Sequence, residues 1–388
     1  MEETYKSILL KNIQPRRTVS NDISNDHVLY KKLLMNHPNI ALTDTLDDLE
    51  NYSFKECDSE TDPVIKSSRG IVYSGEKMIC NSFPFTASFT TEQVNDIIRF
   101  FGDLDISQVT FFPCYEGTIV RVFNHNDKWY ISTNRRLNAD QCNWGPDRET
   151  FGSKFRAKFN KDGGDDPFSI LDKKKTYFFL IENNMKSRLV CQKEFPQLYF
   201  IGVLGASGEI FKNDFLAPKG TVSPELLSFE TYEKAIEYAE KTDWKIQQGI
   251  IVFCPGFVQV KIISTEYNKR FLARNNNPHI GNRYLELLGK NNEEQLNLFV
   301  EMYLDYSDEF LSYEKNIQII SRKLLMLFGD RYIFKKFVRT TPQKHFIIKT
   351  AWKESNFDEK NVSIEEIRKI LLRQNTRTIH TLIRDMVN

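Results

Sequence analysis

The chain has 388 residues, with 53 Lys and Arg against 52 Asp and Glu, and 40% of its residues are hydrophobic. This length exceeds what one compact core holds, so the sequence predicts two domains. The balanced charge excludes a polycation that coats nucleic acid along its whole surface, so any basic site must be local. The six cysteines form no CxxC pattern and no Cys/His pair at metal-ligand spacing, which indicates free thiols and no structural zinc.

The expected setting of the protein also follows from composition. No apolar run approaches the roughly 20 residues of a membrane span, and no apolar segment follows the Met-Glu-Glu start, so we expect a cytoplasmic protein without a membrane partner. Abundant Phe, Asn, Lys and Ile are typical of AT-rich genomes such as those of large DNA viruses. Infected cells or virions are therefore the expected surroundings.

Residues 1–60 mix polar runs with short apolar stretches, so we expect short helices, a loop around 44–62, and packing of this segment on the following domain. Over 61–275 apolar and polar residues alternate, which predicts strands within 64–85, 109–133, 176–184, 198–211 and 249–264. Helical spacing behind Thr or Ser start signals predicts helices at 90–104 and 223–244. The charged, Gly-Gly-containing stretch 152–175 is expected to be an exposed excursion. Over 276–388 apolar residues recur every three or four positions, which predicts a helical domain.

One tetrapeptide carries a functional signal: Cys114-Tyr115-Glu116-Gly117 lies between two predicted strands. It resembles motif I of the nucleotidyltransferase superfamily (RNA ligases, DNA ligases and capping enzymes), where Lys-x-Asp-Gly closes a strand and the lysine attacks a nucleotide α-phosphate. The tetrapeptide itself supplies no cation that would lower the pKa of the Cys114 thiol.

Other segments resemble the remaining motifs of the superfamily, in the same order. Arg69-Gly70 resembles the strand before the nucleophile, the segment with Glu182 and Arg188 resembles motif III, Gln248-Gly249 stands at motif IV, and Lys261 stands at motif V. The set is most similar to the tRNA-repair RNA ligases of T-even bacteriophages. The resemblance implies an α+β fold in which two antiparallel sheets flank a nucleotide cleft, followed by an all-α domain.

The departures from the motifs all remove charge. Cys114 stands for the lysine nucleophile, Gln248 for a metal-binding carboxylate, Gln259 for the first motif V lysine and Ala87 for a lysine of the preceding turn. Lysine adenylation requires such an amine, such carboxylates and such cations. We therefore expect a catalytically degenerate protein.

The resemblance nevertheless assigns positions to a site. The catalytic positions are Cys114, Glu116 and Gln248, and the nucleotide- or phosphate-binding positions are Arg69, Gly117, Glu182, Arg188 and Lys261. Alternatives remain open: Cys114 as a small buried hydrophobe, Glu182 and Arg188 as a surface pair, and Lys261 on a solvated strand face. No metal ligands are assigned and no resident cofactor is expected, with ATP and Mg²⁺ required only if activity is retained.

A second signal lies in the helical domain, where basic residues alternate with aromatic ones. Phosphate neutralisation combined with base stacking uses this pairing, although solvated helix faces produce the same pattern. The predicted nucleic-acid contacts are Arg135 and Arg136 after the 128–133 strand, and Lys335, Lys336, Arg339, Lys344, Arg373 and Arg377. RNA is the expected partner; an active ligase with another nucleophile and a module for protein assembly are the alternatives.

Overall fold

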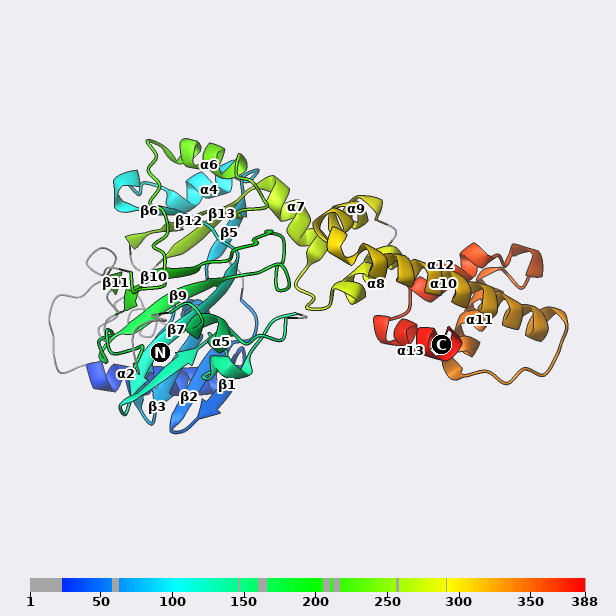
Figure 1. The fold of residues 1–388 in the computed structure, drawn as a ribbon, viewed down its shortest axis with the longest axis horizontal. Helices are drawn as coiled ribbons and strands as arrows, with labels where there is room; N and C mark the ends of the chain where they lie inside the picture. Colours follow the sequence, from blue (N-terminus) through cyan, green and yellow to red (C-terminus); the bar gives the residue numbers. More distant parts are fainter. Residues whose placement is uncertain are drawn as a thin grey trace. The chain divides into compact units, whose positions relative to one another are not determined.

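The computed structural model describes residues 23–57, 63–145, 147–159, 166–204, 210–211, 217–255, 258–290 and 292–387. The chain divides into two compact units, Met1–Asn268 and Lys269–Asn388, and the division falls within helix α7 (Thr265–Arg274). The first unit is built on β-sheets and the second on helices, so the chain is an α+β protein (Figure 1). No helix in the described ranges is long and apolar enough to cross a membrane.

The described part of the first unit contains three sheets, where the sequence predicted two. The first has the order β1-β2-β3-β4: β1 (Ile40–Leu46), β2 (Leu49–Phe54), β3 (Arg69–Ser74) and β4 (Lys77–Cys80). The second has the order β11-β10-β9-β7-β8: β7 (Gly117–His125), β8 (Lys128–Ser132), β9 (Thr176–Glu182), β10 (Leu198–Leu204) and β11 (Ile210–Phe211). The third has the order β5-β13-β12-β6: β5 (Ala87–Thr90), β6 (Thr110–Pro113), β12 (Gly249–Phe253) and β13 (Gln259–Ile263). Strand pairing is antiparallel throughout these sheets except between β5 and β13.

Strands β1 and β2 of the first sheet lie where the sequence predicted short helices and a loop around 44–62, and the short helix α3 (Pro63–Ser67) precedes β3. After helix α2 (Ile23–Asn36), β1 and β2 form a hairpin whose turn holds Asp47 at φ 54°. Asn51 of β2 is fully buried, and its side-chain amide donates to Thr43 Oγ1 at 2.7 Å and to the carbonyl of Asn134 at 3.1 Å. Strands are recognised in a sequence by apolar residues at every second, inward-facing position. A buried polar residue at such a position breaks this alternation, so the strand was not predicted.

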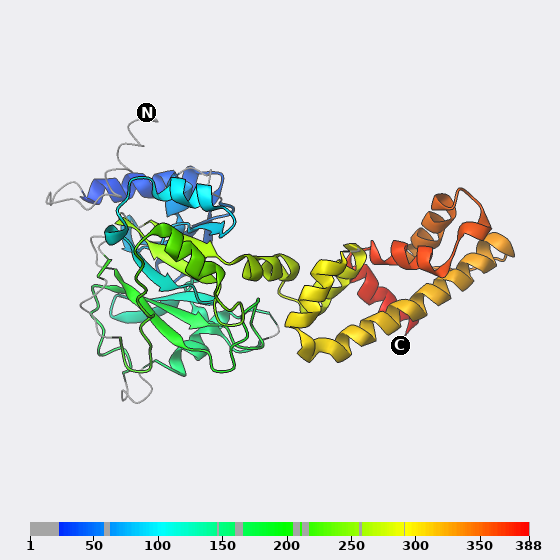
Figure 2. The same ribbon diagram turned by 90° about the horizontal axis from the view of Figure 1, so that it is seen from above.

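Two helices cover one face of the third sheet. Helices α4 (Val94–Phe101) and α6 (Tyr232–Glu240) lie over it in both views (Figures 1 and 2). Their buried side chains, among them Ile97 and Ala235, join Ile250, Val252 and Val260 of the strands in one hydrophobic cluster. On the opposite face, Phe253 and Ile251 pack with Phe178 of the second sheet in another hydrophobic cluster. Gln259 and Lys261, which alternate with the apolar Val260 on β13, share that face.

The charged stretch 152–175 is exposed at many of its described residues, as expected, but a few apolar side chains anchor it in the core. Helix α5 (Phe151–Arg156) begins one residue before this stretch and forms its first turns. Phe151, Phe155 and Phe159 recur every four residues and are buried in one cluster together with Leu171. Apolar residues at this spacing line one side of a helix, and the surrounding charges hide the pattern.

Arg121 on β7 ties the first two sheets together. Its guanidinium is fully buried and donates to the carbonyls of Gly70 and Thr133 and to Ser132 Oγ. The acceptors are neutral, and burial lowers the pKa of Arg121. Its stabilising role therefore depends on supplying donors to buried carbonyls.

We expect Arg121→Met to reduce the free energy of unfolding of the first unit by about 2–4 kcal/mol, because it strands buried acceptors while preserving most of the apolar volume. Urea denaturation followed by tryptophan fluorescence measures this, since Trp129, Trp144 and Trp244 lie in that unit. Exposed Arg99→Met on α4 is the control, and equal stability of the two variants would contradict the role of Arg121.

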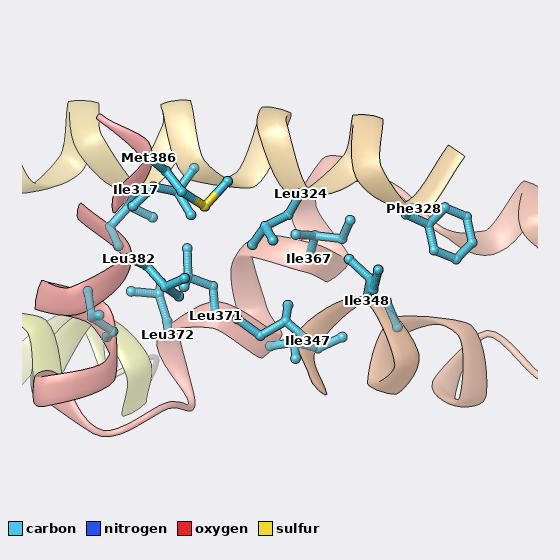
Figure 3. Packing of buried hydrophobic residues seen from close by; sticks show 14 of the residues in the cluster. Ile317, Leu324, Phe328, Ile347, Ile348, Ile367, Leu371, Leu372, Leu382 and Met386 are labelled. Atoms are coloured by element: carbon cyan, nitrogen blue, oxygen red, sulfur yellow. The ribbon is translucent and has the colours of Figure 1, made fainter. Parts of the chain in front are cut away.

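The second unit is a helical bundle, as the sequence predicted. Its helices are α8 (Ile280–Lys290), α9 (Glu293–Met302), α10 (Ser307–Phe328), α11 (Pro342–Glu354), α12 (Ile364–Leu372) and α13 (Thr376–Met386). Ile317, Leu324 and Phe328 on α10 point toward residues of α11, α12 and α13, such as Ile348 and Leu371 (Figure 3). The long helix α10 therefore forms one side of the hydrophobic core, and α11, α12 and α13 pack against it.

Candidate functional site

The tetrapeptide that starts at Cys114 carries the chain from one sheet to another. Strand β6 ends at Pro113 and pairs with β12, whereas β7 begins at Gly117 and pairs with β9. Beyond β6 the pairing with β12 continues, because the amide of Cys114 donates to the Gly249 carbonyl at 2.9 Å and the amide of Gln248 donates to the Cys114 carbonyl at 2.8 Å. The sheet thus brings together two of the segments that resemble motifs.

Glycines in these segments are required by close backbone approach. A Cβ on Gly117 would lie 2.3 Å from the carbonyl oxygen of Ile181, and a Cβ on Gly70, at φ +85°, would lie 2.4 Å from that of Asn134. Both distances are below any ordinary Cβ contact. The close backbone packing therefore requires Gly70 and Gly117, whether or not the protein retains catalytic activity.

Cys114, Gln248 and Lys261 form one contact group. Lys261 Nζ donates to Gln248 Oε1 at 3.2 Å, and its charge also acts on the Cys114 thiol. Gln248 Nε2 donates to the Tyr115 carbonyl at 3.0 Å. Burial raises the pKa of Cys114, and Lys261 offsets part of this rise. The cation that the tetrapeptide lacks thus comes from β13, but the net effect still favours the neutral thiol.

Glu116 is a buried carboxylate surrounded by donors. Its Oε1 accepts from the amide of Leu189 and from Asn183 Nδ2, and its Oε2 accepts from the amides of Val190 and Cys191 at 2.8 and 3.1 Å. Tyr267 on α7 adds a hydroxyl donor at 3.0 Å to Oε2. The side chain is 2% exposed. Its lone pairs are committed to holding the 189–191 backbone, which leaves it poorly suited to bind a metal ion.

Glu182 presents the contrasting case. It is 3% exposed, and Oε2 accepts from the amide of Gln197 at 2.9 Å. Oε1 lies 3.4 Å from Lys193 Nζ, yet it accepts no hydrogen bond from the described residues. Burial raises the pKa of Glu182. A buried carboxylate whose second oxygen is held only by the ion pair with Lys193 keeps the capacity to accept from a ligand hydroxyl or amino group.

Two aromatic rings lie beside this carboxylate. Tyr115 and Tyr199 stack with ring centroids 4.2 Å apart and planes 6° apart, and Lys193 Nζ lies 5.7 Å from the centroid of Tyr115. Burial raises the pKa of both tyrosines, and the charge of Glu182 adds to the rise. The rings thus form a flat neutral surface next to an acceptor.

A second polar group lies at the edge of the third sheet. Arg69 Nη1 donates to the Pro84 carbonyl and to Thr86 Oγ1, each at 3.3 Å, and Thr86 in turn donates to Gln259 Oε1 at 3.2 Å. Gln259 is 5% exposed, and its Nε2 has no acceptor among the described residues. Gln259 and Lys261 are two positions apart on β13 and therefore share a face. Arg69, Gln259 and Lys261 together offer donors to an anion.

The same residues fit a phosphate better than a divalent cation. Mg²⁺ prefers carboxylate and water oxygens, but Glu116 is occupied by amides and Gln248 is neutral and already bonded. Within the described ranges, no group of three or more His, Cys, Asp or Glu side chains could hold a metal ion. The donor set therefore does not fit a magnesium site.

The other predicted residues occupy varied environments. Arg188 is buried, and its Nη1 donates to the Met185 carbonyl, so it does not form the surface pair considered as an alternative. Arg136 Nη1 lies 3.5 Å from Asp44 Oδ1, and Arg135 Nη2 donates to the Lys55 carbonyl. Both side chains therefore tie the turn after β8 to the segment of β1 and β2.

In the second unit the predicted basic residues also differ from one another. Arg373 forms a two-pronged pair with Glu354, at 2.8 and 3.0 Å, which joins α12 to α11. Lys335, Lys336, Arg339 and Arg377 are exposed, and Lys344 is half-buried. Arg373 and Lys336, which pairs with Asp330 at 2.8 Å, therefore stabilise the unit, whereas the exposed Lys335, Arg339 and Arg377 remain candidates for ligand contacts.

Sequence reasoning missed Tyr115, Tyr199, Lys193 and Thr86 as parts of the site. Tyr115 was within the tetrapeptide, but its variable position in the resemblance gave it no role. Thr86 stands beside Ala87 in the turn before the tetrapeptide, and Tyr199 lies in the 198–211 segment, but neither position was assigned a role. Only the folding of the sheets places Thr86 against Gln259, Tyr199 against Tyr115, and Lys193 against Glu182.

Related sequences come from viruses. The chain is 29% identical over 338 residues to the "Immediate-early protein ICP-46 homolog" of Invertebrate iridescent virus 6, covering 81% of this chain and 73% of the relative. It is 24% identical over 344 residues to the protein of the same description from Invertebrate iridescent virus 3, covering 85% and 75% of the two chains. The "Immediate-early protein ICP-46" of Frog virus 3 is 21% identical over 223 residues, with 52% and 56% covered. No protein-family model matches the sequence.

Solved structures with similarity to this chain include ligases. An "Archaeal ATP-dependent RNA ligase - form 2" aligns with a TM-score of 0.43 at 12% identity and covers 75% of this chain and 76% of its own. A "Putative ATP-dependent DNA ligase from Aquifex aeolicus" aligns with a TM-score of 0.39 at 12% identity, with 72% of each chain covered.

Proposed function

We propose that this chain is a viral nucleotidyltransferase-like protein that has lost lysine adenylation and binds nucleic acid, RNA in the first place. The observation that carries the proposal is the chemistry at the three catalytic positions. A buried neutral thiol stands for the amine, Glu116 is committed to backbone amides, and Gln248 is a neutral side chain with both ends bonded. These groups hold the sheets together but supply neither a nucleophile nor metal ligands.

The phosphate-binding part of such a site is retained in this proposal. Arg69 and Lys261 both donate to neutral partners, and Gln259 Nε2 is a buried donor without an acceptor in the described ranges. Uncompensated donors of this kind favour a phosphate group. Glu182 would accept from a ribose hydroxyl or a base amino group beside the Tyr115 ring. Reversible binding of a nucleotide or an RNA end follows, without a covalent step.

Covalent labelling tests the loss of adenylation. Purified full-length protein is incubated with α-phosphate-labelled ATP, and separately GTP, with Mg²⁺ or Mn²⁺, and examined on denaturing gels beside an active RNA ligase. We expect no covalent label, and none in Cys114→Lys, because that change restores the amine but not the carboxylates. Label on the wild-type protein would overturn the degenerate assignment.

One contact favours a second candidate function, an active enzyme with a relocated nucleophile. The amine of Lys261 lies close enough to the Cys114 thiol to lower its pKa, so a lysine amine is present beside the motif I position. In that case the wild-type protein and Cys114→Ala would be labelled, and Lys261→Arg would not. Loss of the label in Cys114→Ala alone would instead identify the thiol as the nucleophile.

The nucleic-acid part of the proposal has a separate test. Binding of RNA through phosphates gives a logarithm of affinity that falls linearly with the logarithm of salt concentration. Absence of binding at low salt would favour the remaining alternative, a module that uses the fold for protein assembly. Retained binding together with absent label supports the proposed function.

A further inference from the structure

The connection between α10 and α11 presents aromatic side chains to solvent. Phe337 is 99% exposed and Phe334 is 65% exposed. Exposed aromatic residues of this size are unusual on a protein surface and mark sites of interaction when they lie close together. The connection lies at the end of the long helix α10 in Figure 1.

This connection is fixed by local contacts. It begins with a π-helical turn, Gly329–Ile333, closed by a hydrogen bond from the Phe334 amide to the Gly329 carbonyl at 2.9 Å. Tyr332 stacks on Trp352 of α11 with ring centroids 5.2 Å apart. Lys336 donates to Asp330 through its amide and its ammonium group, each at 2.8 Å. Tyr332 thus anchors the turn to α11, while Phe334 and Phe337 remain exposed to solvent.

The surroundings of the two rings are strongly basic. Residues 329–353 contain seven Lys and Arg and one acid, Asp330, which is paired with Lys336. Burial lowers the pKa of His345, and the charges of Arg331 and Lys349 lower it further. The positive potential is therefore concentrated at this end of α11, where Lys335 and Arg339 are exposed as well.

We propose that Phe334 and Phe337, together with the exposed Lys335 and Arg339 of the same connection and Lys349 of α11, form a platform for single-stranded nucleic acid. A base can stack on a protein aromatic ring when its face is not covered by neighbouring bases, as in a single strand. Lys and Arg side chains then bind the phosphates that link the bases. Over residues 334–339 rings and cations alternate along the chain, as bases and phosphates alternate along a single strand. An anionic membrane would use the same rings and charges without that alternation, so vesicle binding is an outcome of the test below. The inference rests on the nucleic-acid binding of the proposed function and adds the strandedness of the ligand and the stacking residues.

Fluorescence anisotropy with the full-length protein tests the platform, using a fluorescein-labelled 12-nucleotide oligo(U) RNA and a hairpin duplex of equal charge. We expect tighter binding of oligo(U) than of the duplex. Phe337→Ala should weaken binding of oligo(U) by roughly 5- to 100-fold without changing the salt slope, because it removes stacking and no charge. Lys335→Ala with Arg339→Ala should lower the salt slope by about 1.4, as expected for two phosphate contacts on a single strand.

The control is Phe195→Ala, which removes another exposed ring, 81% exposed, from the first unit. Binding by the wild type with no loss in Phe337→Ala, or equal loss in Phe195→Ala, would overturn the platform while leaving the proposed function intact. Failure of the wild type to bind either RNA would overturn both. Binding of phosphatidylserine vesicles that depends on Phe337, with no RNA binding, would assign the surface to a membrane instead.

Discussion

Glu116→Gln will destabilise the first unit by about 3–5 kcal/mol, because three backbone amides donate to a carboxylate that the amide side chain cannot replace. Glutamine keeps one acceptor oxygen, but its NH₂ group must face either the amides of Val190 and Cys191 or that of Leu189. Two donors would then oppose each other in a buried space. Urea denaturation followed by tryptophan fluorescence measures the loss.

Glu194→Gln serves as the matched control, because Glu194 is exposed in the loop that follows the amides bound by Glu116. It should change the free energy of unfolding by less than about 0.5 kcal/mol. If Glu116→Gln were as stable as Glu194→Gln, the carboxylate would not be holding the 189–191 backbone. Glu116 would then be available for ligand chemistry after all.

An acidic residue at the Glu116 position can have a catalytic role or a structural role. The resemblance placed Glu116 among the catalytic positions, and in this fold the residue also sits where the chain crosses from the third sheet to the second. A carboxylate at such a crossing stabilises the junction by binding amides of a neighbouring loop and the hydroxyl of Tyr267. Retention of an acidic residue here is therefore explained by folding alone.

The sequence predicted the order of the segments well but not their contacts. Strand alternation located β6, β7, β9, β12 and β13, and helical spacing located the second unit. The effect of Lys261 on Cys114 could not be predicted, because Lys261 lies on β13 while Cys114 follows β6, and β12 lies between these two strands in the sheet. Both oxygens of Glu116 accept hydrogen bonds from the 189–191 backbone, whereas Oε1 of Glu182 has only the ion pair with Lys193. This difference depends on the paths of the loops, which the sequence pattern does not predict.

Buried polar residues caused the clearest failure of prediction. Asn51 and Ser53 occupy inward positions on β2, where an apolar residue would have marked the strand. Their burial is tolerated because hydrogen-bond partners are available, as for the amide of Asn51 with Thr43 and Asn134. Those partners come from β1 and from a turn more than 80 residues away, so no local reading of the sequence could supply them.

Gly249→Ala will have an effect of similar size, a loss of more than about 3 kcal/mol, for steric reasons. Gly249 has φ +144°, and a Cβ there would lie 2.2 Å from the carbonyl oxygen of Ile262 and 3.0 Å from the Cα of Ile263. Both obstacles are backbone atoms of the paired strand β13, so they cannot move without separating the strands. Thermal or urea unfolding measures the loss.

Gly75→Ala is the control, since Gly75 has φ +54° and no atom within 4 Å of the added Cβ. It should cost about 1 kcal/mol, the strain of a left-handed residue without any collision. If the two variants were equally stable, backbone conformation alone would explain both, and the contact with Ile262 would be unimportant. A larger loss at Gly249 would mean that the strand spacing that positions Cys114 and Lys261 depends on this glycine, because the Gly249 carbonyl accepts the hydrogen bond of the Cys114 amide.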